Sequence, residues 1–376
     1  MKILLLSEFF PAKNDGVISG GVESRTYYLA KELAKRGHDV AVVAAFLSST
    51  KREEIWDGVK IYRVGNQYSY VQSGSNFRRL SFALSSIIKI ADLKYDVIDA
   101  NNTAVYLAAI VGGWLSRARV VYWVPDVMGL AKWWRALGPA TGTLNEINEI
   151  LGSLPLAHAA IALSQTTKEK LKPFCWPEKK LYVIYPGVKV FRPSRAAKVG
   201  NRIVVVNRLT EYKRTDLVIK AVGILKRQGI KISCEIVGTG EQLPALKKLA
   251  KKHQVGPKIK FWENLPHEKV FQIFRRATIF CLPSEIEGFG IVTLEAMTAG
   301  LPFVNSDIPV HQEIARASQA GVLFKSGDPK DLAAKIKMLL ENKKEYRRLS
   351  KNALSFAKNY SLSKMVSKTE KVYLNL

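Results

Sequence analysis

Residues Pro283 to Met297 read PSEIEGFGIVTLEAM and follow an apolar run that ends at Leu282. The apolar run predicts a buried β-strand, and the pattern from Gly290 onwards predicts a helix. The first backbone N–H groups of a helix have no partner within the helix, so such a strand–loop–helix junction binds anions. Gly288 and Gly290 allow a phosphate or a sugar to approach the backbone closely. The stretch therefore indicates an α/β fold with a ligand site at the end of a strand.

Two carboxylates frame this glycine loop. Glu287 lies in the loop, and Glu295 lies inside the predicted helix, one turn after Ile291. An acidic side chain beside a phosphate site suits the hydroxyl groups of a ribose. A tight turn with solvated carboxylates is the plainer interpretation of a glycine loop. Two glutamates eight residues apart around Gly288-Phe289-Gly290 favour a ligand site instead.

A second charged loop spans Asn207–Asp216 and also lies between a predicted strand and a predicted helix. Arg208 and Lys213 are both suited to a diphosphate there, Arg through a bidentate contact and Lys as a compact charge. A charge run in a loop is usually solvated surface, but the position at a strand end favours a ligand contact. Gly238 and Gly240 follow a further strand, where they form either a structural turn or another part of the same ligand-binding edge.

Strand and helix signals alternate along the chain, which predicts parallel sheets with right-handed crossovers. The pattern breaks at a polar linker over 191–202, so we expect a first domain over 1–190 and a second from residue 203. The expected strands are 2–7, 39–45, 97–100, 120–124, 159–163, 203–207, 232–237, 258–261, 279–282 and 302–305. The expected helices are 22–36, 215–228, 243–253, 330–342, 345–358 and 361–376.

Composition excludes several classes of protein. The chain has 376 residues, 47% of them hydrophobic and 24% charged, which excludes a disordered or collagen-like chain. Lys and Arg exceed Asp and Glu by 26, which indicates a polyanionic partner: nucleic acid, an anionic membrane surface or a phosphorylated substrate. Cys175, Cys234 and Cys281 lack zinc-site spacing and indicate a reducing compartment. No apolar run reaches about 18 residues, so no transmembrane helix is expected.

Together these motifs resemble the retaining glycosyltransferases of the GT-B fold, specifically glycosyltransferase family four. The resemblance covers nearly the whole chain in order and spacing. It implies two Rossmann-like, doubly wound parallel-sheet domains that face a deep cleft, with the second domain over 203–358 and a C-terminal helix over 359–376 that crosses back to the first. The stretches that carry it are 208–213, 238–240, 283–284, Glu287 with Glu295-Ala296-Met297, and also 20–23 and 185–188.

The resemblance implies a nucleotide-diphospho-sugar as the donor substrate and no further cofactor. Glu295 would hold the ribose, Arg208 and Lys213 the diphosphate, and Glu287 the donor sugar. Gly20 and Gly21 would face the phosphates across the cleft. The implied donor-binding residues are Gly20, Gly21, Arg208, Lys213, Gly238, Gly240, Glu287, Gly288, Phe289, Gly290, Ile291, Val292 and Glu295; the implied catalytic residues are Glu287, Arg208, Lys213 and Asp126.

The sequence departs from the family pattern in the first domain. Pro125 stands where many members carry a histidine, while Asp126 keeps its place. Either Asp126 or the leaving phosphate would take the acceptor proton. His158 abuts an apolar strand and is interpreted as packing. Arg214 follows Lys213 where a glycine is common, a tolerable variant.

The family implies transfer with retention of configuration to a glycan or lipid-linked acceptor. The sequence contains no Asp-x-Asp motif, so we expect no metal ion. A nucleotide-sugar epimerase of the same architecture and a basic nucleic-acid-binding protein are the alternatives, although we expect no nucleic acid. The nucleotide base, the sugar and the oligomeric state stay open.

Two segments are candidates for contact with an anionic membrane. Trp133 and Trp134 lie in the segment Met128–Gly138, flanked by Lys132 and Arg135, and suit a headgroup interface. The second candidate, Asn76–Tyr95, reads equally well as an amphipathic helix that packs on the sheet. We therefore expect a cytoplasmic enzyme that is peripheral on the cytoplasmic face of a membrane.

Overall fold

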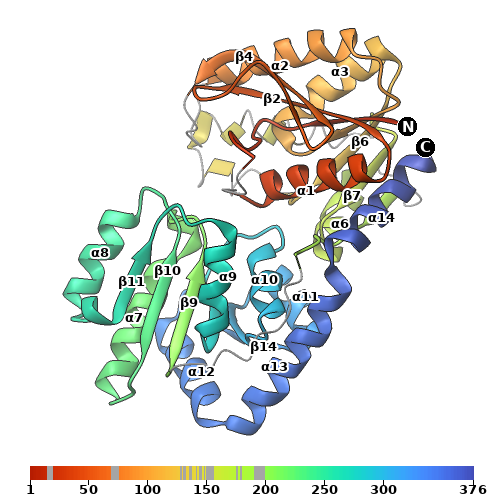
Figure 1. Cartoon of the computed structure of the whole chain (residues 1–376). Helices are drawn as coiled ribbons and strands as arrows, with labels where there is room; N and C mark the ends of the chain where they lie inside the picture. Colours follow the sequence, from red (N-terminus) through yellow and green to blue (C-terminus); the bar gives the residue numbers. More distant parts are fainter. Residues whose placement is uncertain are drawn as a thin grey trace. The chain divides into compact units, whose positions relative to one another are not determined.

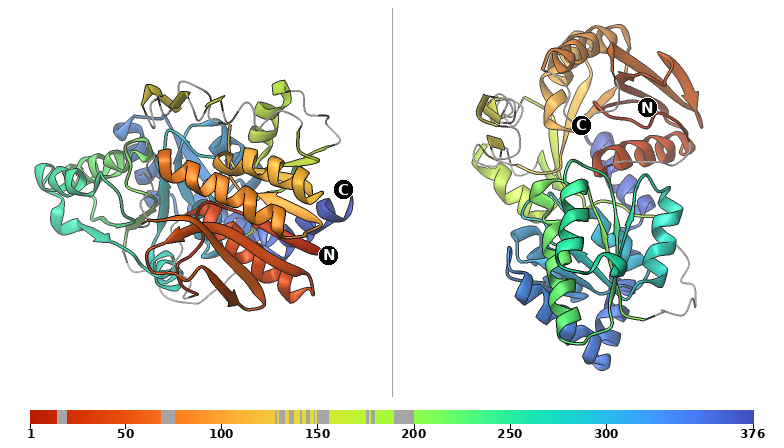
Figure 2. Two further views of the ribbon diagram at one scale, coloured as in Figure 1. Left: turned by 90° about the horizontal axis from the view of Figure 1, so that it is seen from above. Right: turned by 90° about the vertical axis from the view of Figure 1, so that its left-hand side faces the viewer.

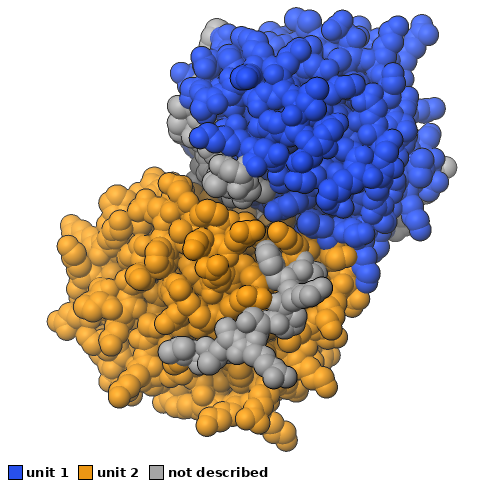
Figure 3. Space-filling model, in the orientation of Figure 1, with its two compact units in different colours: residues 1–187, 362–376 blue, residues 188–361 orange. Residues whose placement is uncertain are grey.

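The chain folds into two compact units, which consist of residues 1–187 with 362–376 and of residues 188–361 (Figures 1 and 3). The structure is a computed structural model. It describes the whole chain except residues 15–19, 69–75, 128, 130–132, 135–137, 141, 144–145, 148, 150–155, 175–176, 178–179 and 190–199. The expected linker over 191–202 thus lies outside the described residues at 191–199.

The first unit is built on a sheet with the order β3-β4-β2-β1-β5-β6-β7-β8. Its neighbouring strands run parallel, except that β3 pairs antiparallel with β4. The strands are β1 (Lys2–Leu6), β2 (Asp39–Leu47), β3 (Glu53–Trp56), β4 (Val59–Tyr68), β5 (Val97–Ala100), β6 (Arg119–Val124), β7 (Ala159–Ala162) and β8 (Leu181–Val183). The strands β1, β2, β5, β6 and β7 are apolar runs that are buried almost throughout, as the inner strands of a parallel sheet require.

The β3–β4 hairpin is an element that the alternation of strands and helices did not predict. Asp57 and Gly58 join the two strands, with φ angles of +50° and +83°. Asp-Gly favours a two-residue hairpin turn because both central residues need a positive φ. This dipeptide was the signal that could have identified the hairpin.

Five helices of the first unit fall in the described part of the chain: α1 (Gly21–Lys35), α2 (Asn76–Asp92), α3 (Tyr106–Ser116), α6 (Gln165–Leu171) and α14 (Leu362–Leu374). The last of these, α14, packs on α1. Glu370 pairs with Arg36 and accepts a hydrogen bond from the imidazole of His38, with 2.6 Å at each contact. Deeper in the unit, the Tyr373 hydroxyl donates to Asp99, a buried carboxylate that also pairs with Arg25. The C-terminal helix is thereby part of the first unit.

The second unit contains a parallel sheet with the order β11-β10-β9-β12-β13-β14. The strands are β9 (Arg202–Val206), β10 (Ser233–Val237), β11 (Ile259–Trp262), β12 (Ile279–Leu282), β13 (Phe303–Ser306) and β14 (Gly321–Phe324). The helices are α7 (Thr215–Arg227), α8 (Leu243–Lys252), α9 (His267–Arg276), α10 (Ile291–Thr298), α11 (Pro309–Ser318), α12 (Pro329–Glu341) and α13 (Lys343–Ala357).

This strand order is that of a doubly wound Rossmann sheet. The chain builds outwards from β9 to β11 in one direction and then from β12 to β14 in the other, so the direction reverses between β9 and β12. Ligands of such sheets bind beyond the carboxyl ends of the strands at the point of reversal. The expected α/β fold class is confirmed, and the two loops selected from the sequence, after β9 and after β12, meet at this point.

Candidate functional site

The loops that follow β9 and β12 are linked by three interactions. The backbone N–H of Glu285 donates to the carbonyl of Tyr212, at 2.9 Å. Arg214 pairs with the carboxylate of Glu285. Lys213 pairs with Glu287, with 2.6 Å between Nζ and Oε1. The structure thus brings together Lys213 and Glu287, two residues predicted from separate motifs.

The Lys213–Glu287 ion pair is largely shielded from water, since each side chain is 11% exposed. Ser284 Oγ donates to the same carboxylate oxygen at 2.8 Å. Burial alone would raise the pKa of Glu287, but the charge of Lys213 and the hydrogen bonds from Lys213 and Ser284 hold that pKa below its ordinary value. The site therefore keeps one fixed negative and one fixed positive charge side by side.

Helix α10 begins at this site without a capping side chain among the described residues. Its N-cap, Gly290, has a φ of +77°, and a Cβ on it would lie 2.9 Å from the Leu282 side chain. Only glycine fits this position without strain. The N–H groups of the first turn, at Ile291 and Val292, are left available for an anion.

The residues next to Gly290 differ in their burial. Phe289 is 2% exposed, so it anchors the loop in the core. Gly288 is half-buried, as are Ile291 and Val292. A donor would therefore meet mainly backbone groups along this loop.

His311, on α11, is a site residue that the sequence motifs did not identify. It is fully buried, and its Nδ1 donates to the backbone carbonyl of Ser306 at 2.9 Å. Its Nε2 has no hydrogen-bond partner in the described part of the chain and lies 3.5 Å from where a Cβ on Gly290 would stand. No short motif surrounds His311, so only its position beside the glycine loop reveals it.

The pH dependence of stability should reflect His311. Burial lowers the pKa of His311 from 6.5 to about 4. The imidazole therefore becomes protonated at a higher pH in the unfolded chain than in the folded chain. Its contribution to stability is complete above pH 6.5 and is lost as the pH falls towards 4. Wild type should lose about 3 kcal/mol more than His311→Gln between pH 7.5 and 4. Urea unfolding at a series of pH values measures this, and parallel pH profiles for the two proteins would contradict it.

Glu295 projects from the second turn of α10 towards α9. Its carboxylate accepts a hydrogen bond from His267 Nε2 at 3.1 Å, and its side chain is 20% exposed. Burial would lower the pKa of His267, but the hydrogen bond and the charge of Glu295 raise it above the ordinary value. Glu295 is thus held by a neighbouring imidazole with one edge accessible to a ligand.

Gly238 and Gly240 have a structural role that the sequence left open. Their φ angles are +151° and +153°, and a Cβ on either would collide with the loop after β9: it would stand 1.8 Å from Asn207 O or 2.4 Å from Leu209 O. The backbone N–H of Leu209 donates to Thr239 O at 2.8 Å. These glycines therefore allow two backbones to approach, and their predicted contact with the donor stays a prediction.

Arg208 and Arg214 flank Lys213 in different ways. Arg208 is exposed and donates to the Tyr212 hydroxyl at 3.1 Å. Arg214 has a φ of +48°, a conformation that glycine adopts without strain, which gives a physical reason why a glycine suits this position. The ion pairs of Arg214 with Asp216 and Glu285 offset the strain.

The predicted site residues of the first unit are Asp126, Gly20 and Gly21. Asp126 follows β6 and pairs with Lys170 of α6, and its carboxylate also accepts from the Val127 backbone N–H at 2.9 Å. Gly20 is the N-cap of α1, and no described atom lies within 4 Å of where its Cβ would be. His158 Nδ1 accepts from the backbone N–H of Val120 at 3.0 Å, as a packed residue does.

The tryptophans proposed for a membrane contact are tied to neighbouring side chains. Trp133 Nε1 donates to the buried Glu149 at 2.8 Å, and Trp134 Nε1 donates to Thr143 Oγ1 at 2.9 Å. Much of the segment Met128–Gly138 lies outside the described residues. The hydrogen bond to Glu149 gives Trp133 a packing role within the first unit.

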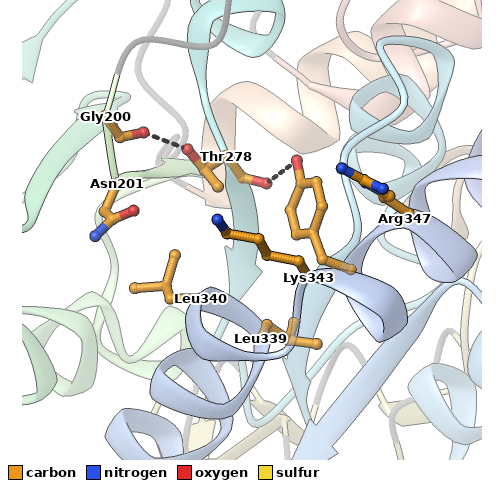
Figure 4. A pocket seen from close by; sticks show the side chains of 8 residues that line it. Gly200, Asn201, Thr278, Leu339, Leu340, Lys343 and Arg347 are labelled. Atoms are coloured by element: carbon orange, nitrogen blue, oxygen red, sulfur yellow. Dashed lines mark hydrogen bonds between the residues drawn. The ribbon is translucent and has the colours of Figure 1, made fainter.

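A pocket of about 370 Å³ lies at the end of the second sheet that is opposite to the loops after β9 and β12 (Figure 4). Asn201 and Thr278 precede β9 and β12, so the pocket is at the amino ends of the strands and separate from the two loops. The Tyr346 hydroxyl closes one side by donating to Thr278 O at 3.1 Å.

Within the described residues, no group of side chains could hold a metal ion, and no helix is both long and apolar enough to cross a bilayer.

Comparison with known proteins gives matches over the whole chain. Residues 19–192 match the model of Glycosyltransferase Family 4, and residues 189–356 match that of Glycosyl transferases group 1. A glycogen synthase from Mycobacterium tuberculosis is 25% identical over 100% of this chain and 94% of its own length. Among solved structures, sucrose-phosphate synthase from Thermosynechococcus elongatus is similar with a TM-score of 0.82 at 19% identity, covering 100% of this chain and 98% of that one. HepE from Anabaena, crystallised with UDP-glucose, has a TM-score of 0.78 at 18% identity, with full coverage of both chains.

Proposed function

Since this chain belongs to the glycosyltransferases of family four, we propose that it moves a sugar from a nucleotide-diphospho-sugar to an acceptor hydroxyl with retention of configuration. The donor is a substrate, and the proposal needs no cofactor. The acceptor is a glycan or a lipid-linked molecule, and the enzyme works in the cytoplasm. HepE was crystallised with UDP-glucose, a nucleotide-diphospho-sugar, and this supports the proposed donor class.

The observation that carries the proposal is the Lys213–Glu287 ion pair beside the open N-terminus of α10. When the bond between sugar and diphosphate breaks, positive charge develops on the sugar and negative charge on the diphosphate. Lys213 and the α10 N–H groups suit the diphosphate, while Glu287 suits the sugar. Preorganised groups of this kind contribute about 3–4 kcal/mol each to transition-state stabilisation.

The remaining residues fit around this pair. Arg208 is exposed at the same strand end, where its guanidinium adds a second cation for the diphosphate. The Nε2 of His311, which has no hydrogen-bond partner among the described residues, is an acceptor beside Gly290 and suits a hydroxyl of the donor sugar. Glu295, held by His267, suits the two ribose hydroxyls.

Glu295→Ala should weaken the affinity for nucleoside diphosphate about ten- to hundredfold, because hydrogen bonds from ribose to a charged group are lost. The value of kcat should change less, since ribose contacts are made in the ground state and in the transition state alike. Glu268→Ala is the matched control, because it removes an exposed acid one residue from His267. Calorimetric titration of both variants with nucleoside diphosphate measures the affinity. An unchanged nucleotide affinity in Glu295→Ala would rule out the assignment of Glu295 to the ribose.

We propose that the reaction needs no metal ion. Lys213 and Arg208 supply the charge that a divalent ion would otherwise bring to the diphosphate. The acceptor proton goes to Asp126 or to the leaving phosphate. Asp126 already accepts hydrogen bonds from Lys170 and from the Val127 N–H, and these contacts compete with an acceptor hydroxyl.

The test is release of nucleoside diphosphate from a panel of nucleotide-sugars in excess chelator, with and without sugar and lipid-linked acceptors. We expect acceptor-dependent release that the chelator does not abolish, and an anomeric configuration in the product, read by NMR, that matches the donor. Interconversion of the donor sugar without an acceptor would instead identify an epimerase. Loss of activity in chelator that magnesium or manganese restores would overturn metal independence.

A further inference from the structure

Helices α2 and α3 carry a surface of large apolar side chains that no other part of the described chain covers. On α2, Leu80, Leu84 and Ile88 recur every fourth residue, and Ile88 is 72% exposed. On α3, the corresponding stripe consists of Leu107, Val111, Trp114 and Leu115, and Trp114 is 67% exposed. Soluble surfaces rarely gather apolar side chains in this way unless they bind something.

The two helices that carry these stripes lie side by side. Gly112 of α3 packs so closely on α2 that a Cβ there would lie 2.7 Å from the Ile90 side chain. Figure 2 shows the helices next to each other on the outer face of their sheet. The opposite sides of both helices are buried, through Phe82 and Ile90 on α2 and through Ala109 on α3. The buried sides of both helices therefore provide their packing on the sheet. This packing gives no reason for the apolar residues on the exposed sides.

Charge distinguishes this surface from an ordinary helix face. α3 contains no charged residue, although an exposed helix normally carries polar residues on its outer side. Cations lie at the ends of the two helices: Arg78 in the first turn of α2, Lys94 just beyond its end, and Arg117 and Arg119 just beyond the end of α3. Two exposed acids, Asp92 and Asp96, lie beside Lys94, so the rim of this apolar strip is mixed at that end and basic at the others.

We propose that the α2–α3 face docks the protein on an anionic lipid bilayer. Apolar side chains enter the boundary between headgroups and acyl chains, while Lys and Arg meet the lipid phosphates, each worth about 1 kcal/mol near an anionic surface. The net charge of +26 acts in the same direction over longer distance. A second copy of this chain would add positive charge to a surface already rimmed by cations, whereas anionic lipid neutralises it.

This face is better exposed than Trp133 as a membrane contact; Trp134 is 46% exposed, and its predicted membrane contact stays a prediction. Trp133 is half-buried and its indole N–H is bound to Glu149, whereas the seven apolar side chains of α2 and α3 are exposed. The inference deepens the proposed function and rests on it in one respect: docking would give the site access to a lipid-linked acceptor.

The experiment is co-sedimentation of the full chain, without donor or acceptor, with vesicles of phosphatidylcholine alone or mixed with phosphatidylglycerol, at low and high salt. Wild type should bind the mixed vesicles and bind less in high salt. Leu84→Ser/Ile88→Ser and Trp114→Ser should each lower partitioning about tenfold or more, because apolar area no longer enters the bilayer. Arg117→Asn should weaken binding mainly at low salt; asparagine tolerates the left-handed backbone found there, with φ +59°.

Ile55→Ser is the matched control, since Ile55 is 73% exposed on β3 of the same unit, and it should bind like wild type. Absence of wild-type binding to anionic vesicles, or binding that the α2 and α3 substitutions leave unchanged, would overturn the proposal. So would a dimer in sedimentation velocity that these substitutions dissociate, because the face would then bind a second copy. Nucleotide affinity, measured in parallel, should be unaffected by all of these variants, so that a failure of docking is distinguishable from a failure of the proposed reaction.

Discussion

Replacing Glu287 by glutamine is expected to lower kcat about a hundred- to a thousandfold, because the side chain keeps its shape but loses the charge that faces the reacting sugar. KM for the donor should change much less, since the negative charge matters most when positive charge develops on the sugar. Initial-rate kinetics with donor and acceptor, at saturating and limiting donor, measure both constants.

Glu285→Gln is the matched control for Glu287. Glu285 lies two residues earlier in the same loop and pairs with Arg214 instead of Lys213. It should retain kcat within about threefold, since a change that touches no reacting group leaves transition-state binding intact. Equal loss of kcat in both variants would mean that Glu287 acts through the loop's structure, and full activity in Glu287→Gln would remove it from the mechanism.

Replacing Lys213 by methionine is expected to have the largest effect of all, because it affects both catalysis and stability. The value of kcat/KM should fall about a thousandfold or more when the cation at the diphosphate is lost. Glu287 would also remain largely buried without its partner, which should destabilise the fold by about 3 kcal/mol and raise the pKa of Glu287. Urea unfolding and the pH profile of the residual activity measure these effects.

The double variant Lys213→Met/Glu287→Gln separates the two effects. Removing both charges should recover much of the stability that Lys213→Met loses, because no unpaired charge is left inside. Catalysis should not recover. A double variant as unstable as Lys213→Met would show that the lost stability does not come from an unpaired charge on Glu287.

The two loops of the site could be predicted from the sequence because the determinants of each are local. A continuous apolar run identifies β9 and β12, and glycines and charges mark the loop behind each strand. The doubly wound order then places the carboxyl ends of β9 and β12 next to each other. Lys213 and Glu287, 74 residues apart, meet for that reason.

Other features depend on contacts that no local pattern contains. His311 belongs to the site through a hydrogen bond to Ser306 and its position beside Gly290, and neither leaves a motif. Gly238 and Gly240 look like a ligand loop in sequence, yet their close contacts are with the neighbouring backbone. The exposed stripe of α2 has the same spacing as the apolar stripe of a helix that packs on a sheet. Only the exposure of these side chains distinguishes a surface for binding from a packed face.

The roles predicted for Gly20, Gly21 and Asp126 stay predictions. Each is assigned by resemblance to a contact with substrate, and the local structure supports only their accessibility or their pairing. Gly20 has open space around its Cα in the described chain, and Asp126 is held by Lys170. Substitution of Gly20 by alanine is sterically allowed within its own unit, so an effect on donor affinity would report a ligand contact.

Calorimetric titration of the full chain with UDP, GDP and ADP in excess chelator tests whether Lys213 and the loops after β9 and β12 bind a nucleoside diphosphate. Wild type should bind at least one of these nucleotides. Lys213→Met should weaken that binding at least about tenfold, and Lys220→Met should not. Lys220 is a suitable control because it is a half-exposed lysine on α7 that pairs only with Asp216 among the described residues. Binding of none of the three nucleotides, or equal affinity in wild type and Lys213→Met, would contradict the assignment of this site to a nucleotide-sugar donor.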